Sequence, residues 1–322
     1  MPNTTRKPAT ARAAAGKPTS RAGFTSAGRG GQRPPAPPQR RWRLALGVGG
    51  AAVALVAGGL WMSGRGGDSA PDTTAAGVYV GGDLHTLTVA DGRLYVGGHD
   101  GVAVSTDGGT DWTSVTSLRG ADAMGWAITP AGIFAGGHPG LFRSTNDGST
   151  FTKTAGLGTV SDVHALGAAG ATAYLASPQA GLLTSDDGGL TWQPRNSEVG
   201  HSFMGTILVD PANPQRLIAP DMQNGLVTSS DGGTTWTSLG GPGGAMAAAW
   251  DPTNTQRIVA VGMNGGAISS DGGRTWTDLT LPPGTSAATF STDGKSLYAA
   301  ALDGNTAHTF ASADAGTTWT PR

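Results

Sequence analysis

From residue 78 onward, short apolar-rich stretches alternate with turns that are rich in glycine and aspartate. The first four stretches are Leu84–Ala90, Arg93–Gly98, Gly101–Ser105 and Asp111–Thr116. Stretches of this length bounded by such turns are typical of β-strands that are joined as hairpins. We therefore predict an inner strand, two middle strands and an outer strand, and the same pattern recurs along the chain.

One hairpin motif, Ser-x-Asp-x-Gly-x-Thr-Trp, is repeated with regular spacing. The aromatic residues that end its six copies are 39 to 44 residues apart: Trp112, Phe151, Trp192, Trp236, Trp276 and Trp319. Asp-Gly-Gly provides the positive φ angles and the side-chain acceptor that a tight turn needs. We therefore interpret the third residue of each copy as structural rather than catalytic: Asp107, Asn146, Asp187, Asp231, Asp271 and Asp314.

A repeat of about 40 residues built from short strands predicts the blades of a β-propeller. Six copies predict an all-β, six-bladed propeller over residues 78–322, with Val78-Tyr79-Val80 available as a closing strand. The motif resembles the Asp-box, or BNR repeat, of sialidases, sortilin-like receptors, photosystem assembly propellers and many exported bacterial proteins. The chain is most similar to the exported propellers labelled glycosylhydrolase or exo-α-sialidase-like, and this resemblance implies either glycoside hydrolysis or ligand binding.

The residues before the propeller predict a membrane anchor. Residues 1–41 are rich in Pro, Gly, Ala and Arg and predict a disordered, basic, cytoplasmic tail. Residues 42–63 contain 19 uncharged residues, Leu44–Met62, preceded by Arg40, Arg41 and Arg43, and predict a single transmembrane helix. A cleaved twin-arginine signal is the alternative. Residues 64–77 predict a flexible linker, so that the propeller would lie outside the cytoplasm at the cell membrane.

Composition and charge narrow the classes of function. The chain has no cysteine, which excludes disulfides, thiolate metal sites and thiol catalysis. Residues 1–67 hold eleven Lys/Arg and no acid, whereas residues 68–322 hold ten Lys/Arg against 22 acids, a net charge of −12. An acidic body disfavours nucleic-acid binding. We expect a monomer that requires no cofactor and has the membrane and a protein or glycan ligand as partners.

Histidine and methionine gather at one predicted face of the propeller. This face contains the starts of the inner strands and the turns between the second and third strands, whereas the Asp-box turns lie on the opposite face. We predict a ligand-binding face formed by His85, His99, His138, His164, His201, Asp162 and Asp221. Packing alone is one explanation for the clustering. The other is a soft-metal site, with copper as the candidate ion, formed by His85, His99, Met124, His138, His164, Met204, Met222, Met246 and Met263.

An enzyme is the alternative to a binding module. The sialidase tyrosine–glutamate pair is not evident, because Glu198 is the only glutamate in the chain. The arginine triad is not evident either, because too few arginines are expected on the ligand-binding face. Only Arg119 and Arg195 are expected to reach the ligand-binding face. A different glycosidase could use two aspartates on either side of the glycosidic bond, and the catalytic candidates are Asp162 and Asp221.

Overall fold

The computed structural model describes residues 77–322. The tail, the transmembrane helix and nearly all of the linker expected from the sequence lie outside the described residues. Within residues 77–322, no helix has both the length and the apolar character needed to cross a membrane.

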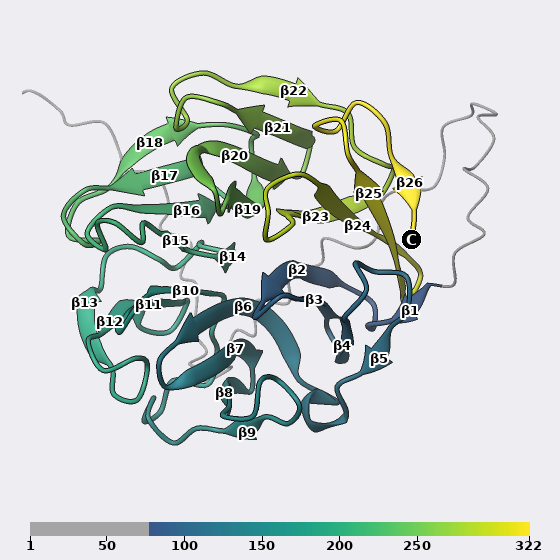
Figure 1. The fold of residues 1–322 in the computed structure, drawn as a ribbon. Helices are drawn as coiled ribbons and strands as arrows, with labels where there is room; N and C mark the ends of the chain where they lie inside the picture. The colour runs from purple at the N-terminus through teal and green to yellow at the C-terminus, as the bar shows by residue number, and fades with distance from the viewer. Residues whose placement is uncertain (1–76) are drawn as a thin grey trace, which may run out of the picture. The chain divides into compact units, whose positions relative to one another are not determined.

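Six sheets are arranged around a central axis as the blades of a propeller (Figure 1). The six-bladed prediction is therefore confirmed. The first three blades, each given from the inner to the outer strand, are β2 (Leu84–Ala90), β3 (Arg93–Gly98), β4 (Gly101–Ser105) and β5 (Thr113–Ser114); β6 (Asp122–Thr129), β7 (Gly132–His138), β8 (Gly140–Ser144) and β9 (Thr152–Lys153); and β10 (Ala165–Ala169), β11 (Thr172–Ser177), β12 (Gly181–Ser185) and β13 (Gln193–Asn196).

The remaining blades follow the same order, and a short 3₁₀ helix, η1 (Thr116–Leu118), leads from blade 1 to blade 2. Blades 4 to 6 are β15 (Leu208–Val209), β16 (Leu217–Asp221), β17 (Gly225–Ser229) and β18 (Thr237–Gly240); β19 (Ala245–Asp251), β20 (Asn254–Gly262), β21 (Gly265–Ser269) and β22 (Thr277–Leu279); and β23 (Thr285–Phe290), β24 (Leu297–Asp303), β25 (Thr306–Ser312) and β26 (Thr320–Pro321). Before blade 4, β14 (Gly205–Thr206) pairs in parallel with β10 of blade 3.

The two ends of the described chain meet in blade 6. The strand β1 (Val78–Tyr79) pairs with one part of β25, and β26 pairs with the adjacent part. Both strands therefore add to the outer edge of the same blade, which joins the first and last segments of the ring. The closing strand available in the sequence takes this role.

The predicted inner and middle strands of blade 1 match β2, β3 and β4, but the outer strand is shorter than Asp111–Thr116. The Asp107 carboxylate accepts a hydrogen bond from the Asp111 amide at 3.0 Å, and the Trp112 indole donates to the Gly109 carbonyl at 3.0 Å. These bonds hold Asp111 and Trp112 in the turn. Only Thr113 and Ser114 then pair as the strand β5.

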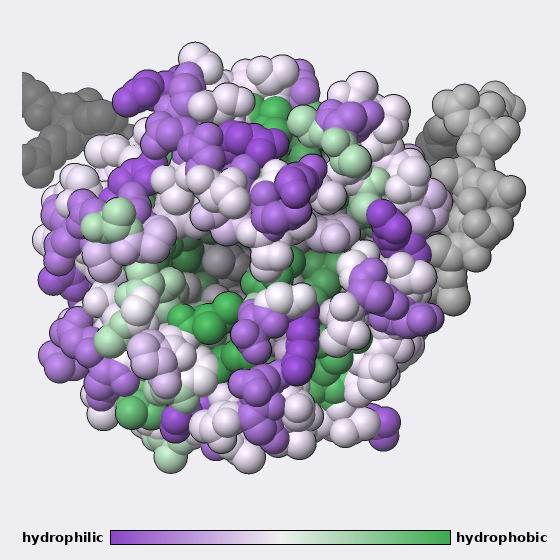
Figure 2. Space-filling view, viewed as in Figure 1, coloured by the Kyte–Doolittle hydropathy of each residue, from purple (hydrophilic) through white to green (hydrophobic). Residues whose placement is uncertain are grey.

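The core consists of hydrophobic layers between neighbouring blades. Tyr95 of blade 1 lies 4.8 Å from Trp126 of blade 2, and Trp126 packs edge-on against Phe151 at 5.8 Å between ring centroids. Trp126 is buried, so it serves blade packing. Viewed along the axis, the molecule is hollowed near its centre, where hydrophobic residues are visible between mainly polar ones (Figure 2).

Strand direction sorts the loops onto two faces. The inner strands all begin on one face, which they share with the turns between second and third strands. We call this the histidine face. The Asp-box turns lie on the opposite face, together with the ends of the inner strands. In agreement, Thr129 at the end of β6 donates a hydrogen bond to Gly188 in the Asp-box of blade 3, at 2.8 Å.

Candidate functional site

Four histidines and two aspartates from blades 1 to 3 meet on the histidine face. We call them the His–Asp cluster: His85, His99, Asp122, His138, Asp162 and His164. The two carboxylates lie deeper than most of the rings around them. His99 and His138 are 65% and 51% exposed, whereas Asp122 and Asp162 are 6% and 16% exposed. The cluster therefore combines buried negative groups with imidazoles that solvent can reach.

Asp122, the first residue of β6, lies at the centre of three imidazoles. Its Oδ1 is 3.1 Å from His85 Nε2, and its Oδ2 is 3.4 Å from Nδ1 of both His99 and His138. The Asp122 Oδ1 and His85 Nε2 atoms are buried, but neither has a partner with hydrogen-bond geometry among the described residues. Burial lowers the pKa of His85, although the charge of Asp122 acts in the opposite direction. A neutral His85 ring therefore faces a buried carboxylate.

Asp162 lies between two further imidazoles. Its Oδ1 is 2.9 Å from His138 Nε2 and also 2.9 Å from His164 Nε2. Burial raises the pKa of Asp162, but the contacts with His164 and His138 outweigh this effect and leave the pKa below its usual value. His138 is the link between the two carboxylates, because its Nδ1 faces Asp122 and its Nε2 faces Asp162.

The pairing of several inner strands shifts register near their first residues, on the histidine face. In blade 1 the register shifts between Leu84 and Thr86, so that His85 is the unpaired residue of a β-bulge. The same shift occurs at Met124 in blade 2 and Met246 in blade 5. A bulge bends the strand and changes the direction of its extra side chain. The repeated register shift therefore takes His85, Met124 and Met246 out of the regular strand pairing.

Close backbone approach brings blades 2 and 3 together at the cluster. The Val163 amide donates to the Gly137 carbonyl at 3.1 Å, which places the neighbouring Asp162 beside His138. Gly137 has no room for a side chain, because an added Cβ would lie 1.2 Å from the Asp122 carbonyl oxygen. The glycine before His138 is thus part of what positions the site.

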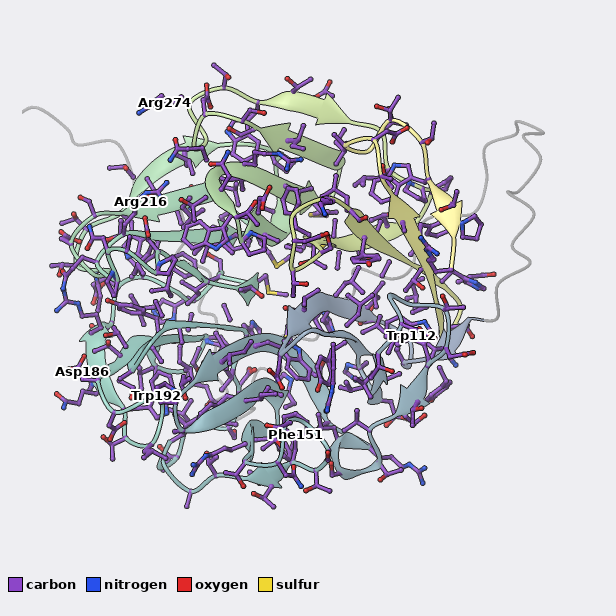
Figure 3. All side chains as sticks on the ribbon, viewed as in Figure 1. Trp112, Phe151, Asp186, Trp192, Arg216 and Arg274 are labelled. Atoms are coloured by element: carbon purple, nitrogen blue, oxygen red, sulfur yellow. The ribbon has the colours of Figure 1, made fainter. Side chains whose placement is uncertain are left out.

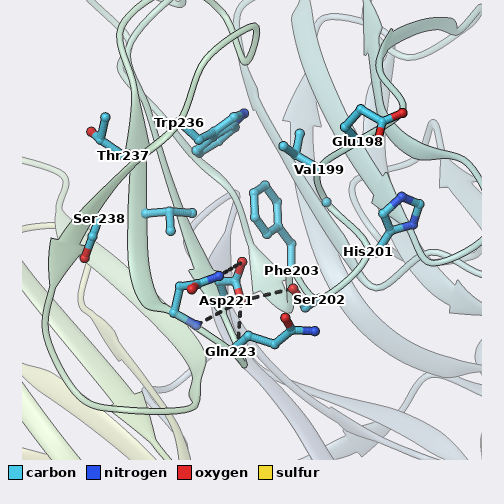
Figure 4. Close-up of a pocket in the computed structure, with 13 residues that line it drawn as sticks. Glu198, Val199, His201, Ser202, Phe203, Asp221, Gln223, Trp236, Thr237 and Ser238 are labelled. Carbon is cyan, nitrogen blue, oxygen red and sulfur yellow. Dashed lines mark hydrogen bonds between the residues drawn. The ribbon is translucent and has the colours of Figure 1, made fainter. Parts of the chain in front are cut away.

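Asp221 and His201 lie apart from the cluster, beside a pocket between blades 3 and 4. This pocket has a volume of about 460 Å³, and Phe203, Trp236 and Glu198 also line it (Figure 4). Buried Asp221 accepts hydrogen bonds from Ser202 Oγ, from the Gln223 and Asn224 amides and from the Asn224 side chain. Its carboxylate is therefore occupied in holding a turn together.

His201 contacts main-chain oxygens only. Its Nδ1 is 3.1 Å from the Pro178 carbonyl and its Nε2 is 2.9 Å from the Ser197 carbonyl. It contributes to the surface of the pocket, whereas the four clustered histidines face carboxylates.

The methionines are distributed around the ring. Sulfur atoms, which all belong to methionine because the chain has no cysteine, lie near the central opening beside β14 and β19 (Figure 3). Met124 and Met204 are buried, whereas Met263 is exposed and lies over Gly244 in blade 5. The groups that converge most closely in the His–Asp cluster are nitrogen and oxygen donors.

Arg195 does not reach the histidine face, contrary to the prediction. Its guanidinium donates to the carbonyls of Gly232 and Asp231 in the Asp-box of blade 4, at 2.7 and 2.6 Å. The outer strand β13 runs beside the next blade, so a long side chain there contacts that blade's hairpin. Arg195 therefore joins two blades.

The Asp-box side chains hold their own turns. In blade 3, Ser185 Oγ donates to Asp187 at 2.8 Å and accepts from the Gly189 amide at 2.8 Å. Bonds from the Thr191 side chain and amide hold the pKa of Asp187 at about 2. The anchor residues Trp112, Phe151 and Trp192 lie well away from the central opening (Figure 3). These hairpins are remote from the His–Asp cluster.

Asp122 is a residue of the cluster that is not among the site residues predicted from the sequence. A signal was present, because Asp83-x-His85, Asp122-x-Met124 and Asp162-x-His164 occupy equivalent positions in three successive blades. The motif Gly-Gly-His also recurs and ends at His99 and His138. These two patterns together define the cluster.

Known proteins are similar to this chain in fold but not in sequence. No protein-family model matches the sequence, and no curated protein matches it. The propeller in a nidogen/laminin complex has a TM-score of 0.56 at 14% identity, over 71% of this chain and 91% of that one. YCF48 from Cyanidioschyzon merolae has a TM-score of 0.50 at 15% identity, over 76% of this chain and 86% of that one. The shared feature is the propeller.

Glycoside hydrolases of the GH74 group are also similar in structure. The GH74 xyloglucanase from Xanthomonas campestris has a TM-score of 0.49 at 19% identity, over 77% of this chain and 46% of that one. The corresponding share of the Niastella koreensis GH74 enzyme is 55%, so the chain spans about half the length of these enzymes. Similarity at this level concerns the fold, and the resemblance to Asp-box propellers is consistent with it.

Proposed function

We propose that the chain is a membrane-anchored, extracytoplasmic propeller that binds a protein ligand on its histidine face. The anchor is the segment 42–63, and the basic residues before it would keep the N-terminus in the cytoplasm. The observation that carries the proposal is the His–Asp cluster. Its largely buried carboxylates and the exposed rings of His99 and His138 are polar groups in fixed positions, of the kind that gives an interface its specificity.

Exposed residues on the same face favour a protein as the ligand. Tyr79 is 55% exposed and donates a hydrogen bond to Asp100, next to His99. Met263, in the corresponding turn of blade 5, is 62% exposed. Tyrosine and methionine are enriched where proteins bind one another. Among propellers of similar fold, the one from nidogen occurs in a complex with laminin.

Glycoside hydrolysis has less support. It needs two carboxylates that can act on one bond. Of the two candidates, Asp221 accepts three hydrogen bonds from its own turn and one from Ser202, and Asp162 contacts two imidazoles. A pair of free carboxylates is therefore not formed by these residues.

The binding proposal is tested with the full chain in detergent. Captured proteins are identified by mass spectrometry, and each purified candidate is titrated against the wild type and a His99→Ala/His138→Ala double variant. We expect at least tenfold weaker binding by the double variant. Leu190→Ala is the matched control, because this exposed residue lies in an Asp-box turn on the opposite face. Binding that depends on Leu190 but not on the histidines would refute the assignment.

The membrane arrangement has a separate test, which the absence of cysteine makes simple. A membrane-impermeant maleimide is applied to intact cells that produce Thr10→Cys or Ser238→Cys. We expect labelling at position 238 only. Labelling at position 10 alone would contradict the proposed orientation, because it would place the N-terminus outside the cell.

A further inference from the structure

We propose that His138, Asp162 and His164 form a binding site for one divalent transition-metal ion, with Zn²⁺ as the best fit, and that Asp122 is a positioning residue for it. The ion would bind in the same His–Asp cluster as the proposed protein ligand, but its binding is measured without that ligand, so that either proposal can fail alone. It starts from one atom, Asp162 Oδ1, which lies 2.9 Å from the Nε2 atoms of both histidines. The three potential ligand atoms all lie within 4.8 Å of one another.

The contacts of Asp162 Oδ1 with His138 and His164 differ in geometry from ordinary hydrogen bonds. Despite the two short distances, Asp162 Oδ1 is buried and has no hydrogen-bond partner among the described residues. The N–H directions of the two rings therefore do not meet the oxygen. Zinc bonds of about 2.0–2.2 Å at right-angled to tetrahedral geometry place neighbouring ligand atoms roughly 2.9–3.5 Å apart. Short, misdirected contacts between an oxygen and two nitrogens are what ligands of a shared ion produce.

The charge of the cluster also favours a divalent cation. Asp122 and Asp162 are largely buried, and all their ion-pair contacts among the described residues are to histidines. No lysine or arginine among the described residues forms an ion pair with either carboxylate. Buried charge without a counterion is unfavourable. An ion with two positive charges at Asp162 would offset most of it.

Asp122 supplies the outer contact that metal-binding histidines need. Its Oδ2 lies within hydrogen-bond distance of His138 Nδ1, at 3.4 Å. A carboxylate at this position favours the tautomer in which Nδ1 carries the proton, which leaves the Nε2 lone pair free for a metal. Asp122 is 6% exposed, so its carboxylate is largely shielded from solvent.

The main chain holds the three ligands in position. The His164 amide donates to the Ala176 carbonyl at 3.0 Å, and the Gly205 amide donates to the His164 carbonyl at 2.9 Å. The Val163 amide is fixed to blade 2 through Gly137. Because His138 is half exposed, a fourth coordination position would face solvent and be open to water or to a side chain of a ligand.

The nitrogen and oxygen donors of this site favour a different metal from the copper considered in the sequence analysis. Two imidazoles and a carboxylate form a borderline nitrogen and oxygen set, which suits Zn²⁺ and related divalent ions. Thioether ligands would be needed to favour Cu(I). The second group of possible ligands, Asp83, His85 and His99, serves as the internal comparison in the experiment.

The test uses the full chain without a histidine tag, stripped with a chelator and titrated with ZnCl₂ by calorimetry. CoCl₂ provides an optical readout through its visible absorption bands. We expect one ion per chain, and loss of binding in Asp162→Asn and His164→Ala. Asp122→Asn should keep the stoichiometry but bind about 10–100-fold more weakly. His201→Ala is the matched control, because its ring contacts only carbonyl groups.

Folding is checked separately by circular dichroism and thermal unfolding. Zn²⁺ should raise the melting temperature of the wild type and of His201→Ala, but not that of Asp162→Asn. Three results would overturn the proposal: no stoichiometric binding by the wild type, unchanged binding by Asp162→Asn and His164→Ala, or binding lost in His85→Ala and His99→Ala while the proposed ligands are dispensable.

Discussion

The Asp-box serine is expected to stabilise the ring far more than an exposed serine does, and Ser229→Ala tests this. Ser229 is 3% exposed. Its Oγ accepts hydrogen bonds from the Gly233 amide at 2.9 Å and the Asp231 amide at 3.3 Å, and it donates to Asp231 Oδ1 at 2.8 Å. Alanine leaves the buried Gly233 N–H without an acceptor. A buried donor without a partner costs about 1–3 kcal/mol.

A loss of about 2 kcal/mol corresponds to a fall of roughly 4–8 °C in melting temperature for a domain of this size. The assay is urea and thermal unfolding of the full chain, followed by tryptophan fluorescence. Ser238→Ala is the control, because this serine is exposed in β18 and makes only a 3.4 Å contact; its effect should stay within about 0.5 kcal/mol. Equal effects of the two substitutions would refute the reasoning.

Three further predictions concern backbone contact, acid stability and a buried ion pair. Gly137→Ala should prevent stable folding, because its Cβ would overlap the Asp122 carbonyl, whereas Gly101→Ala meets open space and should be tolerated in the same solubility and unfolding assays. The urea midpoint should fall between about pH 4 and pH 2, because carboxylates with a lowered folded pKa stabilise only while they are ionised; a midpoint that is unchanged at pH 2 would contradict this. A smaller decline should begin below pH 6.5, because the pKa of buried His85 is also lowered in the folded state. The pKa is held at about 2 in Asp187, Asp231, Asp271 and Asp314. Arg257→Ala should lower the free energy of unfolding by about 2–3 kcal/mol, because it removes the partner of buried Asp251, while Lys295→Ala, which breaks an exposed pair, should have almost no effect in the same urea titration.

The candidate site could be predicted from the sequence only in part. Strand alternation was sufficient to place His85 and His99 on one face, and their ring centroids are 6.5 Å apart. The contact between His138 and His164, at 5.9 Å, crosses from blade 2 to blade 3. This contact depends on how closely the segment before β10 approaches Gly137. The spacing of residues along the chain does not predict that distance.

The contacts of Arg195 were also not predictable from the sequence. Its position in an outer strand was predictable, but its length allows contact with either face. The neighbouring Asp-box, with its outward-facing carbonyl groups, decides where the guanidinium binds.

The sequence by itself determined the number of blades, the type of hairpin and the face on which histidines gather. These features follow from local rules: Asp-Gly turns, alternating strand direction and a repeat of about 40 residues. Only the tertiary structure decided that blades 1 to 3 share two largely buried carboxylates, and that Asp221 accepts hydrogen bonds from Ser202 and from its own turn. The physical reason is that burial and contact between blades depend on the packing of segments far apart in the chain.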